Sequence, residues 1–221
     1  MIQGNLTQDQ ASEVDDILRS KLQSSPLPCD AKTDIMCAEL PPGVNIVRCD
    51  SLAGEEDTNT LVTNYYQAGP GNIRDQAIME AIVLLMEEPV FDTLRTQEQL
   101  GYQVSMTFRN TYGVFGLSVT VNTQANKFTP DHVDQRVENF FKTFVSESIN
   151  SETVSQAIQS LLKLKVCAST HRLTKLTIVH LQLAADVTLQ EEMSRNWQEI
   201  MSREYVFDRS EKHAAILSEL G

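Results

Sequence analysis

The chain has 221 residues, of which 41% are hydrophobic and 22% are charged, and its formal net charge is -12. This composition is typical of a globular protein and excludes a chain that is disordered throughout. We expect no membrane segment, because no apolar run reaches the roughly 18 residues that span a bilayer, and no nucleic-acid ligand, because phosphate backbones carry the same sign of charge.

The N-terminus lacks the basic and then apolar pattern of a signal peptide. The four cysteines show no C-x-x-C pair, and a chain of this length does not depend on disulfides to fold. We therefore expect reduced thiols and a cytoplasmic protein. The cysteines are Cys29, Cys37, Cys49 and Cys167.

The histidines do not have the spacing of a zinc site. None pairs with another at i and i+4, and none belongs to an H-E-x-x-H motif or to its inverted H-x-x-E-H form. The sequence therefore predicts that this chain has no zinc site. The histidines are His132, His171, His180 and His213.

The first predicted helix begins after Thr7, whose hydroxyl accepts a hydrogen bond from a free amide of the first turn. A short strand end at residues 2–3 precedes it, and apolar residues recur along it at helical spacing up to Leu22. The segment Ser24-Ser25-Pro26-Leu27-Pro28 stops the helix, because proline has no amide proton and disfavours helix in the residue before it. This segment is the predicted linker.

Three strands are predicted next. Residues 35–40 and 44–49 flank Pro41-Pro42-Gly43, a pattern that indicates two strands joined by a tight turn, and residues 61–67 form the third strand. Asn72 then caps a long helix that Pro89 bends or restarts. Because this helix is apolar almost all round, we expect it to lie between a sheet and another layer.

The second half of the chain predicts a hairpin followed by helices. Apolar and polar residues alternate on both sides of residues 110–113, which is typical of a β-hairpin with one buried face. Thr129-Pro130-Asp131 then begins a helix with an apolar face from Val133 to Val145. Further helices are predicted from Ser151, at 189–201 and at 210–220. The fold class is therefore α+β, a two-layer sandwich with a mainly antiparallel sheet and helices packed on one face.

The stretch from Phe91 to Tyr102 is the most distinctive part of the sequence. Its pattern predicts a short helix that leads into a strand, with Arg95 near the helix end and Gly101 allowing the backbone to turn. Arg95 and Tyr102 both donate hydrogen bonds, which suits the carbonyl groups of an extended peptide. Alternatively, Arg95 pairs with a local acid such as Glu98, and the Tyr102 hydroxyl points into water.

Several short motifs along the chain resemble the C-terminal half of the insulinase/pitrilysin family of zinc metallopeptidases, in the order that the family shows. The sequences of residues 109–121 and 162–165 resemble the nardilysin-type branch of that family more than the insulin-degrading branch. The motifs are Gly4-Asn5-Leu6-Thr7, Tyr65-Tyr66-Gln67, Glu88-Pro89-Val90-Phe91, Leu94-Arg95-Thr96, Gln99-Leu100-Gly101-Tyr102, Asn196-Trp197 and Tyr205-Val206-Phe207-Asp208-Arg209.

The resemblance implies a part of a metalloendopeptidase that binds substrate and closes a chamber. Arg95 and Tyr102 match the family's substrate-contacting residues, no catalytic residue is expected, and zinc belongs to an N-terminal catalytic half that would be this chain's partner. The chain alone is expected to be inactive. The other partner is a peptide substrate, for which a basic peptide suits the acidic charge. The alternative is a stand-alone, non-catalytic peptide-binding or scaffold protein derived from the family.

The resemblance also implies the domain organisation. Residues 1–32 resemble the last strand and helix of a preceding domain, and residues 33–221 resemble the last, non-catalytic domain without its final elements. We expect the isolated chain to be marginally stable as a result. Residues 172–188 have no counterpart in the resemblance, and they are either a true insertion or an artefact of the gene prediction.

Overall fold

The computed structural model describes residues 2–25, 28, 31, 36–50, 58–168 and 188–220. The chain divides into two compact units, one formed by Met1–Met36 with Asp186–Phe207 and the other by Cys37–Ala185 with Asp208–Gly221. The domain boundary expected after residue 32 stays a prediction. The expected insertion at 172–188 lies, apart from its last residue, outside the described residues.

Helix α1 (Gln8–Leu22) belongs to the first unit and begins as predicted. Thr7 caps it, because the amide of Gln10 donates to the Thr7 hydroxyl over 3.3 Å and the Gln10 side chain accepts from the Thr7 amide over 2.9 Å. Gln23, with φ of 47°, ends it in the left-handed conformation. The strand end predicted at residues 2–3 is wrong, since these residues have no strand structure.

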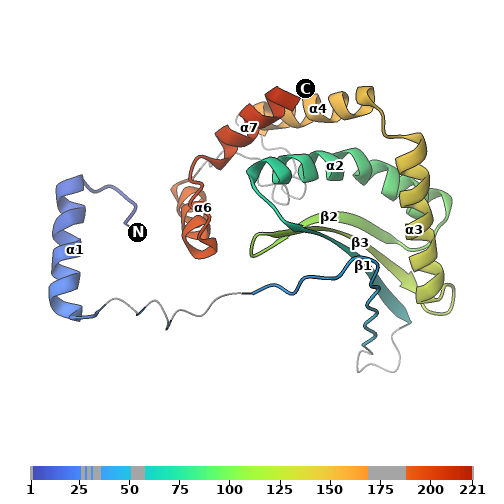
Figure 1. Ribbon diagram of the computed structural model, residues 1–221, viewed down its shortest axis with the longest axis horizontal. Coiled ribbons are helices and arrows are strands. Elements are labelled where there is room, and N and C mark those ends of the chain that lie inside the picture. Colours follow the sequence, from blue (N-terminus) through green and yellow to red (C-terminus); the bar gives the residue numbers. More distant parts are fainter. Residues whose placement is uncertain are drawn as a thin grey trace. The chain divides into compact units, whose positions relative to one another are not determined.

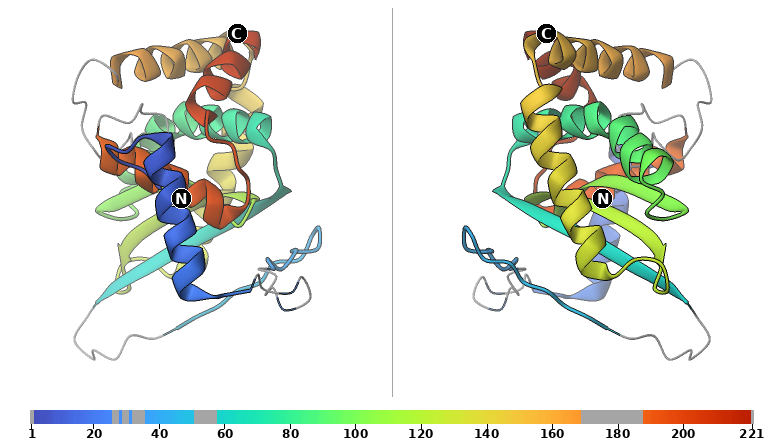
Figure 2. Two further views of the ribbon diagram at one scale, coloured as in Figure 1. Left: turned by 90° about the vertical axis from the view of Figure 1, so that its left-hand side faces the viewer. Right: turned by 90° about the vertical axis from the view of Figure 1, so that its right-hand side faces the viewer.

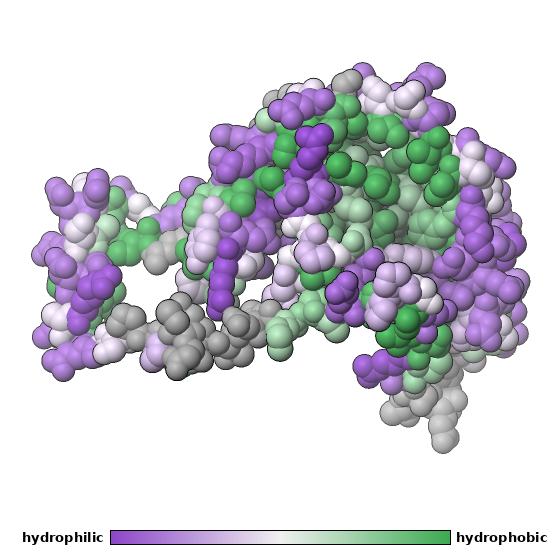
Figure 3. Space-filling model, viewed as in Figure 1, coloured by the Kyte–Doolittle hydropathy of each residue, from purple (hydrophilic) through white to green (hydrophobic). Residues whose placement is uncertain are grey.

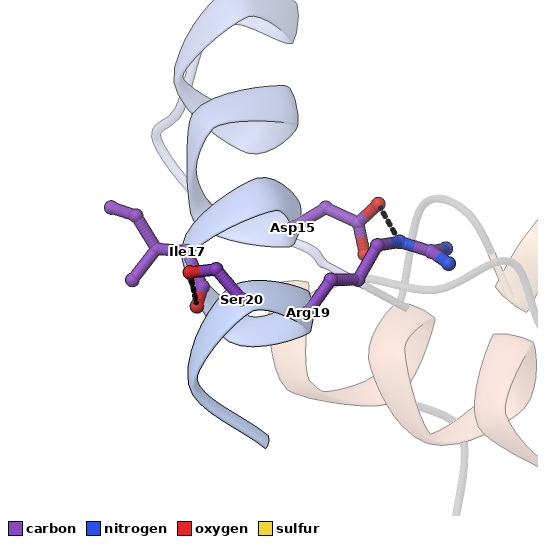
Figure 4. Close-up of polar contacts among 4 residues, drawn as sticks. All are labelled: Asp15, Ile17, Arg19 and Ser20. Carbon is purple, nitrogen blue, oxygen red and sulfur yellow. Dashed lines mark hydrogen bonds and ion pairs between the residues drawn. The ribbon is translucent and has the colours of Figure 1, made fainter. Parts of the chain in front are cut away.

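The surface of α1 has two kinds of side chain. Asp15 and Arg19 form an ion pair of 2.7 Å, and Ser20 donates to the carbonyl of Ile17 over 2.8 Å (Figure 4). No residue of α1 is buried, and the apolar side chains of Val14 and Ile17 are exposed. The apolar stripe of α1 is therefore available to pack against another surface.

Helix α6 (Leu189–Ser202) is the other helix of the first unit and confirms the helix predicted at 189–201. Thr188 caps it in a reciprocal pair of hydrogen bonds with Glu191. Glu199 is buried, and its carboxylate accepts from the amide of Val206 over 2.9 Å. This bond fixes the chain just after the helix.

The second unit contains one antiparallel sheet in the described residues. Its strands are β1 (Asn59–Pro70), β2 (Gln103–Thr111) and β3 (Val114–Gln124), in the spatial order β1-β3-β2 (Figure 1). The hairpin predicted between β2 and β3 is confirmed. Its two-residue turn consists of Tyr112 and Gly113, with φ of 53° and 84°, as the twist of a tight hairpin requires.

The two strands predicted around residues 41–43 are wrong, although the turn between them is present. The amide of Val44 donates to the carbonyl of Pro41 over 3.2 Å, but the described residues on either side form no strand. The side chain of Gln67 instead accepts from the amide of Leu40 and donates to the carbonyl of Ala38. These contacts with one side chain take the place of a backbone ladder.

Helix α2 (Ile73–Phe91) is capped as predicted by Asn72, whose side chain accepts from two backbone amides of the first turn. The helix continues through Pro89 and then becomes the wider π-helix η2 (Asp92–Gln97). The chain therefore changes its winding after Pro89 and enters β2 from η2.

Helix α2 lies between two layers, which explains why its surface is apolar on most sides. Figure 1 shows α2 between the sheet and the helices α4 (Ser151–Ala168) and α7 (Arg209–Leu220). Val83, Met86 and Val90 belong to the core that includes the sheet, whereas Ala77 packs with residues of α4 and α7. Contacts of α2 with β2 on one side and with α4 and α7 on the other confirm the expectation that this helix lies between the sheet and another layer. The helices predicted from Ser151 and at 210–220 are confirmed as well.

Helix α3 (Pro130–Glu147) contacts β1 and completes the helical layer (Figure 2). Its residues Val133, Val137, Phe140 and Phe144 are buried, whereas its outer face is hydrophilic (Figure 3). Val145 was predicted to lie on the apolar face of this helix, but it is 60% exposed, because the next position after Phe144 lies about 100° further round the helix. The α+β fold with helices on one face of the sheet is confirmed.

Tyr66 joins β1 to α3 through a polar contact at the edge of this core. Its hydroxyl donates to the carboxylate of Glu138 over 2.8 Å and accepts from the side chain of Asn64, which also donates to Asp134. Burial and the neighbouring carboxylates raise the pKa of the Tyr66 hydroxyl well above its ordinary value. The neutral phenol is therefore the form that stabilises the fold.

Replacing Tyr66 by Phe should make the free energy of unfolding decrease less as the pH becomes alkaline. The raised pKa means that the contribution of Tyr66 is complete below about pH 10 and is lost as the pH rises above that value. Urea unfolding at pH 7, 9, 10 and 11 should show a smaller decline for Tyr66→Phe than for the parent chain. The exposed Tyr112→Phe is the control. Equal declines for Tyr66→Phe and the parent chain would contradict the assignment.

Candidate functional site

Arg95 lies on η2 and is held by two contacts. Its Nε donates to the backbone carbonyl of Tyr102 over 2.9 Å, and its guanidinium carbon lies 4.7 Å from the centre of the Phe91 ring. The buried side chains of Leu94 and Leu100 anchor the backbone on both sides of this contact. The guanidinium is therefore oriented in advance, while its two Nη groups are left to donate to a ligand.

Tyr102 is positioned by the central strand of the sheet. Its amide donates to the carbonyl of Asn122 over 3.2 Å, and its hydroxyl oxygen accepts from the Asn122 side chain over 2.5 Å. Tyr102 as a whole is 59% exposed. Because Asn122 supplies the donor in this bond, the phenolic hydrogen of Tyr102 is free to donate outward.

The backbone between Arg95 and Tyr102 is shaped by Gln99 and Gly101. Gln99 makes the turn, with φ of 53°. Gly101 is required for a different reason, because a Cβ at this position would lie 2.1 Å from the carbonyl oxygen of Asn122. The turn that was expected at Gly101 is thus made by Gln99, and the Cβ clash that glycine avoids at position 101 is with β3.

Glu98 pairs with α3, which rules out one alternative for Arg95. Two nitrogens of Arg136 donate to the two carboxylate oxygens of Glu98 over 2.7 Å and 2.5 Å. The bonds to Glu98 raise the pKa of Arg136. The alternative in which Arg95 pairs with Glu98 is therefore wrong, and the Glu98–Arg136 pair ties the loop between η2 and β2 to α3.

Arg95 and Tyr102 line the same open pocket, of about 440 Å³. Sequence reasoning singled out these two residues and missed the others, of which Asn122 and Lys127 carry the most chemistry. Asn122 could have been predicted from the hairpin, because the register of the two strands places it opposite Gln103. Lys127 had no comparable signal. The lining residues are Arg95, Thr96, Gln99, Leu100, Gly101, Tyr102, Asn122, Gln124 and Lys127.

The described residues do not fit a zinc centre. They include no group of three or more His, Cys, Asp or Glu side chains able to hold a metal ion. His132 stacks on Phe128, and the Nδ1 of His213 lies 3.4 Å from Glu80 without a third ligand. His171 and His180 lie outside the described residues.

No helix in the described part of the chain is long and apolar enough to cross a membrane.

The chain is similar in sequence to known proteins over most of its length. The family described as PQQ synthase PqqF-like, C-terminal lobe domain 4, matches residues 82–177. Human nardilysin is 36% identical over 211 residues, or 95% of this chain, and human insulin-degrading enzyme is 30% identical over 168 residues, or 75% of it. The chain is homologous to the insulinase/pitrilysin peptidases. The higher identity with nardilysin agrees with the predicted branch of the family.

The homology concerns only a part of each relative. The chain spans 17% of human nardilysin, 19% of the nardilysin-like protein of Arabidopsis thaliana, which is 31% identical, and 14% of human insulin-degrading enzyme. The crystal structure of pitrilysin has a TM-score of 0.62 with 19% identity, and the match covers 97% of this chain and 21% of that one. This likeness shows that the fold is pitrilysin-like.

Proposed function

We propose that this chain is the C-terminal, non-catalytic part of a zinc metalloendopeptidase similar to nardilysin and insulin-degrading enzyme. Its role is to hold a peptide substrate and to close the chamber in which the peptide is cleaved. The metal and the general base are assigned to an N-terminal catalytic half outside this chain, since the described residues do not fit a zinc centre. The chain alone is then inactive toward peptides.

The observation that carries the proposal is the arrangement of Arg95 and Tyr102 at one pocket. The Nε of Arg95 is bound to Tyr102, and the Tyr102 hydroxyl accepts from Asn122, so both side chains have donors left for a ligand. An extended peptide presents carbonyl oxygens that have lost their water on binding and need such donors. Holding the peptide in one orientation is how this surface would assist cleavage.

The proposal predicts that the chain binds an extended peptide through these two residues. Fluorescence anisotropy with a labelled peptide should show that Arg95→Ala and Tyr102→Phe each weaken binding by about tenfold, the effect of one or two lost hydrogen bonds. Tyr102→Phe keeps the ring and removes only the hydroxyl. Arg48→Ala and Tyr112→Phe are the matched controls, because both residues are exposed and neither lines the pocket.

Equal binding by the parent chain and both pocket variants would contradict the proposal. The alternative of a stand-alone binding protein is tested separately, by the size of the native protein that an antibody to this region detects. A species much larger than 24.8 kDa with chelator-sensitive peptidase activity supports the enzyme. A species near 24.8 kDa supports the alternative. A preference for basic peptides stays a prediction from net charge.

A further inference from the structure

The pocket beside Arg95 has the opposite charge to the chain as a whole. The chain has a formal net charge of -12, but the pocket lining contains two cations, Arg95 and Lys127, and no carboxylate. The remaining polar side chains of the lining are amides and hydroxyls. The local field at this site therefore favours a negatively charged group, and the net charge is a poor guide to what the pocket binds.

The acids nearest to Arg95 in the sequence are already engaged elsewhere. Glu98 is bound by two nitrogens of Arg136, and Asp92 accepts from the side chain of Gln97 over 2.7 Å. Neither carboxylate forms an ion pair with Arg95 among the described contacts. The charge of Arg95 is therefore left for a ligand, while its orientation is fixed by Tyr102 and Phe91.

Lys127 reaches the same pocket from the loop that follows β3. Its amide donates to the carbonyl of Gln124 over 2.9 Å, and the amide of Phe128 donates to the same carbonyl, so the backbone of this loop is held to the end of the strand. No ion pair of Lys127 is present among the described residues. Lys127 thus supplies an ammonium group beside the planar, oriented guanidinium of Arg95. Together the two groups are suited to bind a small planar anion.

We propose that this pocket is a subsite for a carboxylate of the bound peptide, with the Nη groups of Arg95 as a planar fork and Lys127 as the second cation. The proposal deepens the proposed function and rests on it. The volume of about 440 Å³ falls in the range of about 300–1,000 Å³ typical of small-ligand sites. The carboxylate belongs either to an acidic side chain or to the C-terminus of the peptide, and the experiment separates these sources.

The test uses the 221-residue chain and one peptide sequence in four forms. An internal Glu or Gln is combined with a C-terminal free acid or amide, and binding is measured by isothermal titration calorimetry. One acidic form should bind about tenfold more tightly than the form without either carboxylate, as expected for a charge-assisted bond. Whether the Glu or the free acid gives this gain identifies the source of the carboxylate.

Lys127→Gln should reduce that gain to about threefold. Lys142→Gln is the matched control, because Lys142 is exposed on α3 and does not line the pocket. Equal affinities for all four forms, with binding still lost in Arg95→Ala, would overturn the carboxylate subsite and leave the proposed function standing. Absence of binding by every form would overturn both.

Discussion

Replacing Gly101 by Ala should unfold the candidate site and lower the free energy of unfolding by about 3 kcal/mol. The new Cβ would lie 2.1 Å from the carbonyl oxygen of Asn122 and 3.2 Å from the Val121 side chain. Asn122 cannot move away, because it belongs to β3 and pairs with Leu61 on one side and Gln103 on the other. The loop that carries Gly101 must move instead, and Tyr102 moves with it.

The measurement combines urea unfolding with peptide binding. Gly113→Ala is a useful comparison, because a Cβ at Gly113 meets no atom within 4 Å and the only cost is its φ of 84°. That cost is about 1–2 kcal/mol, and binding should survive it. A Gly101→Ala chain that is as stable as the parent and binds peptide normally would show that the close approach to Asn122 is not required.

Replacing Glu80 by Ala should lower the free energy of unfolding by about 3–5 kcal/mol, as removal of one partner from a buried polar cluster does. Glu80 on α2 is 1% exposed, accepts from Gln76 over 2.9 Å, and lies 3.4 Å from the Nδ1 of the fully buried His213 on α7. Arg209 donates to Gln76 in turn. The cluster thus joins α2 to α7, and Glu80→Ala leaves the buried side-chain amide of Gln76 without its acceptor.

Urea unfolding measures this effect, and Glu87→Ala is the control. Glu87 lies on the same helix but is exposed, so its replacement should change stability by less than about 0.5 kcal/mol. The double variant Glu80→Met with His213→Leu removes both sides of the Glu80–His213 contact and fills the space with apolar side chains, so it should lose less stability than Glu80→Ala. A loss in the double variant as large as that in Glu80→Ala would indicate that packing, and not polarity, explains the effect.

The sequence was sufficient for those parts of the fold that depend on local signals. Asn72 and Thr129 cap helices because their side chains reach amides a few residues away, and the hairpin follows from alternation around a short turn. The segments beside residues 41–43 show the opposite case. Their apolar residues have the pattern of strands, but a strand exists only where another strand pairs with it, and here Gln67 takes that place.

The sequence predicted the two main residues of the candidate site, but it did not predict the pairing of Glu98 or the presence of Lys127 in the pocket. Resemblance and donor chemistry singled out Arg95 and Tyr102. Glu98 pairs with Arg136, which lies 38 positions away in the sequence. A prediction from local sequence therefore paired Glu98 with Arg95, which is incorrect. Lys127 lines the pocket only because the loop after β3 passes beside η2, a consequence of tertiary structure that no local pattern signals.

The central position of β3 sets the order in which the chain can assemble. β2 and β3 pair across a two-residue turn, whereas β1 reaches β3 only after the chain has passed through α2, η2 and β2. Closing a short loop costs less entropy than closing a long one. The β2–β3 hairpin can therefore form before β1 joins it, and the bonds between Tyr102 and Asn122 lie within that early-forming part of the chain.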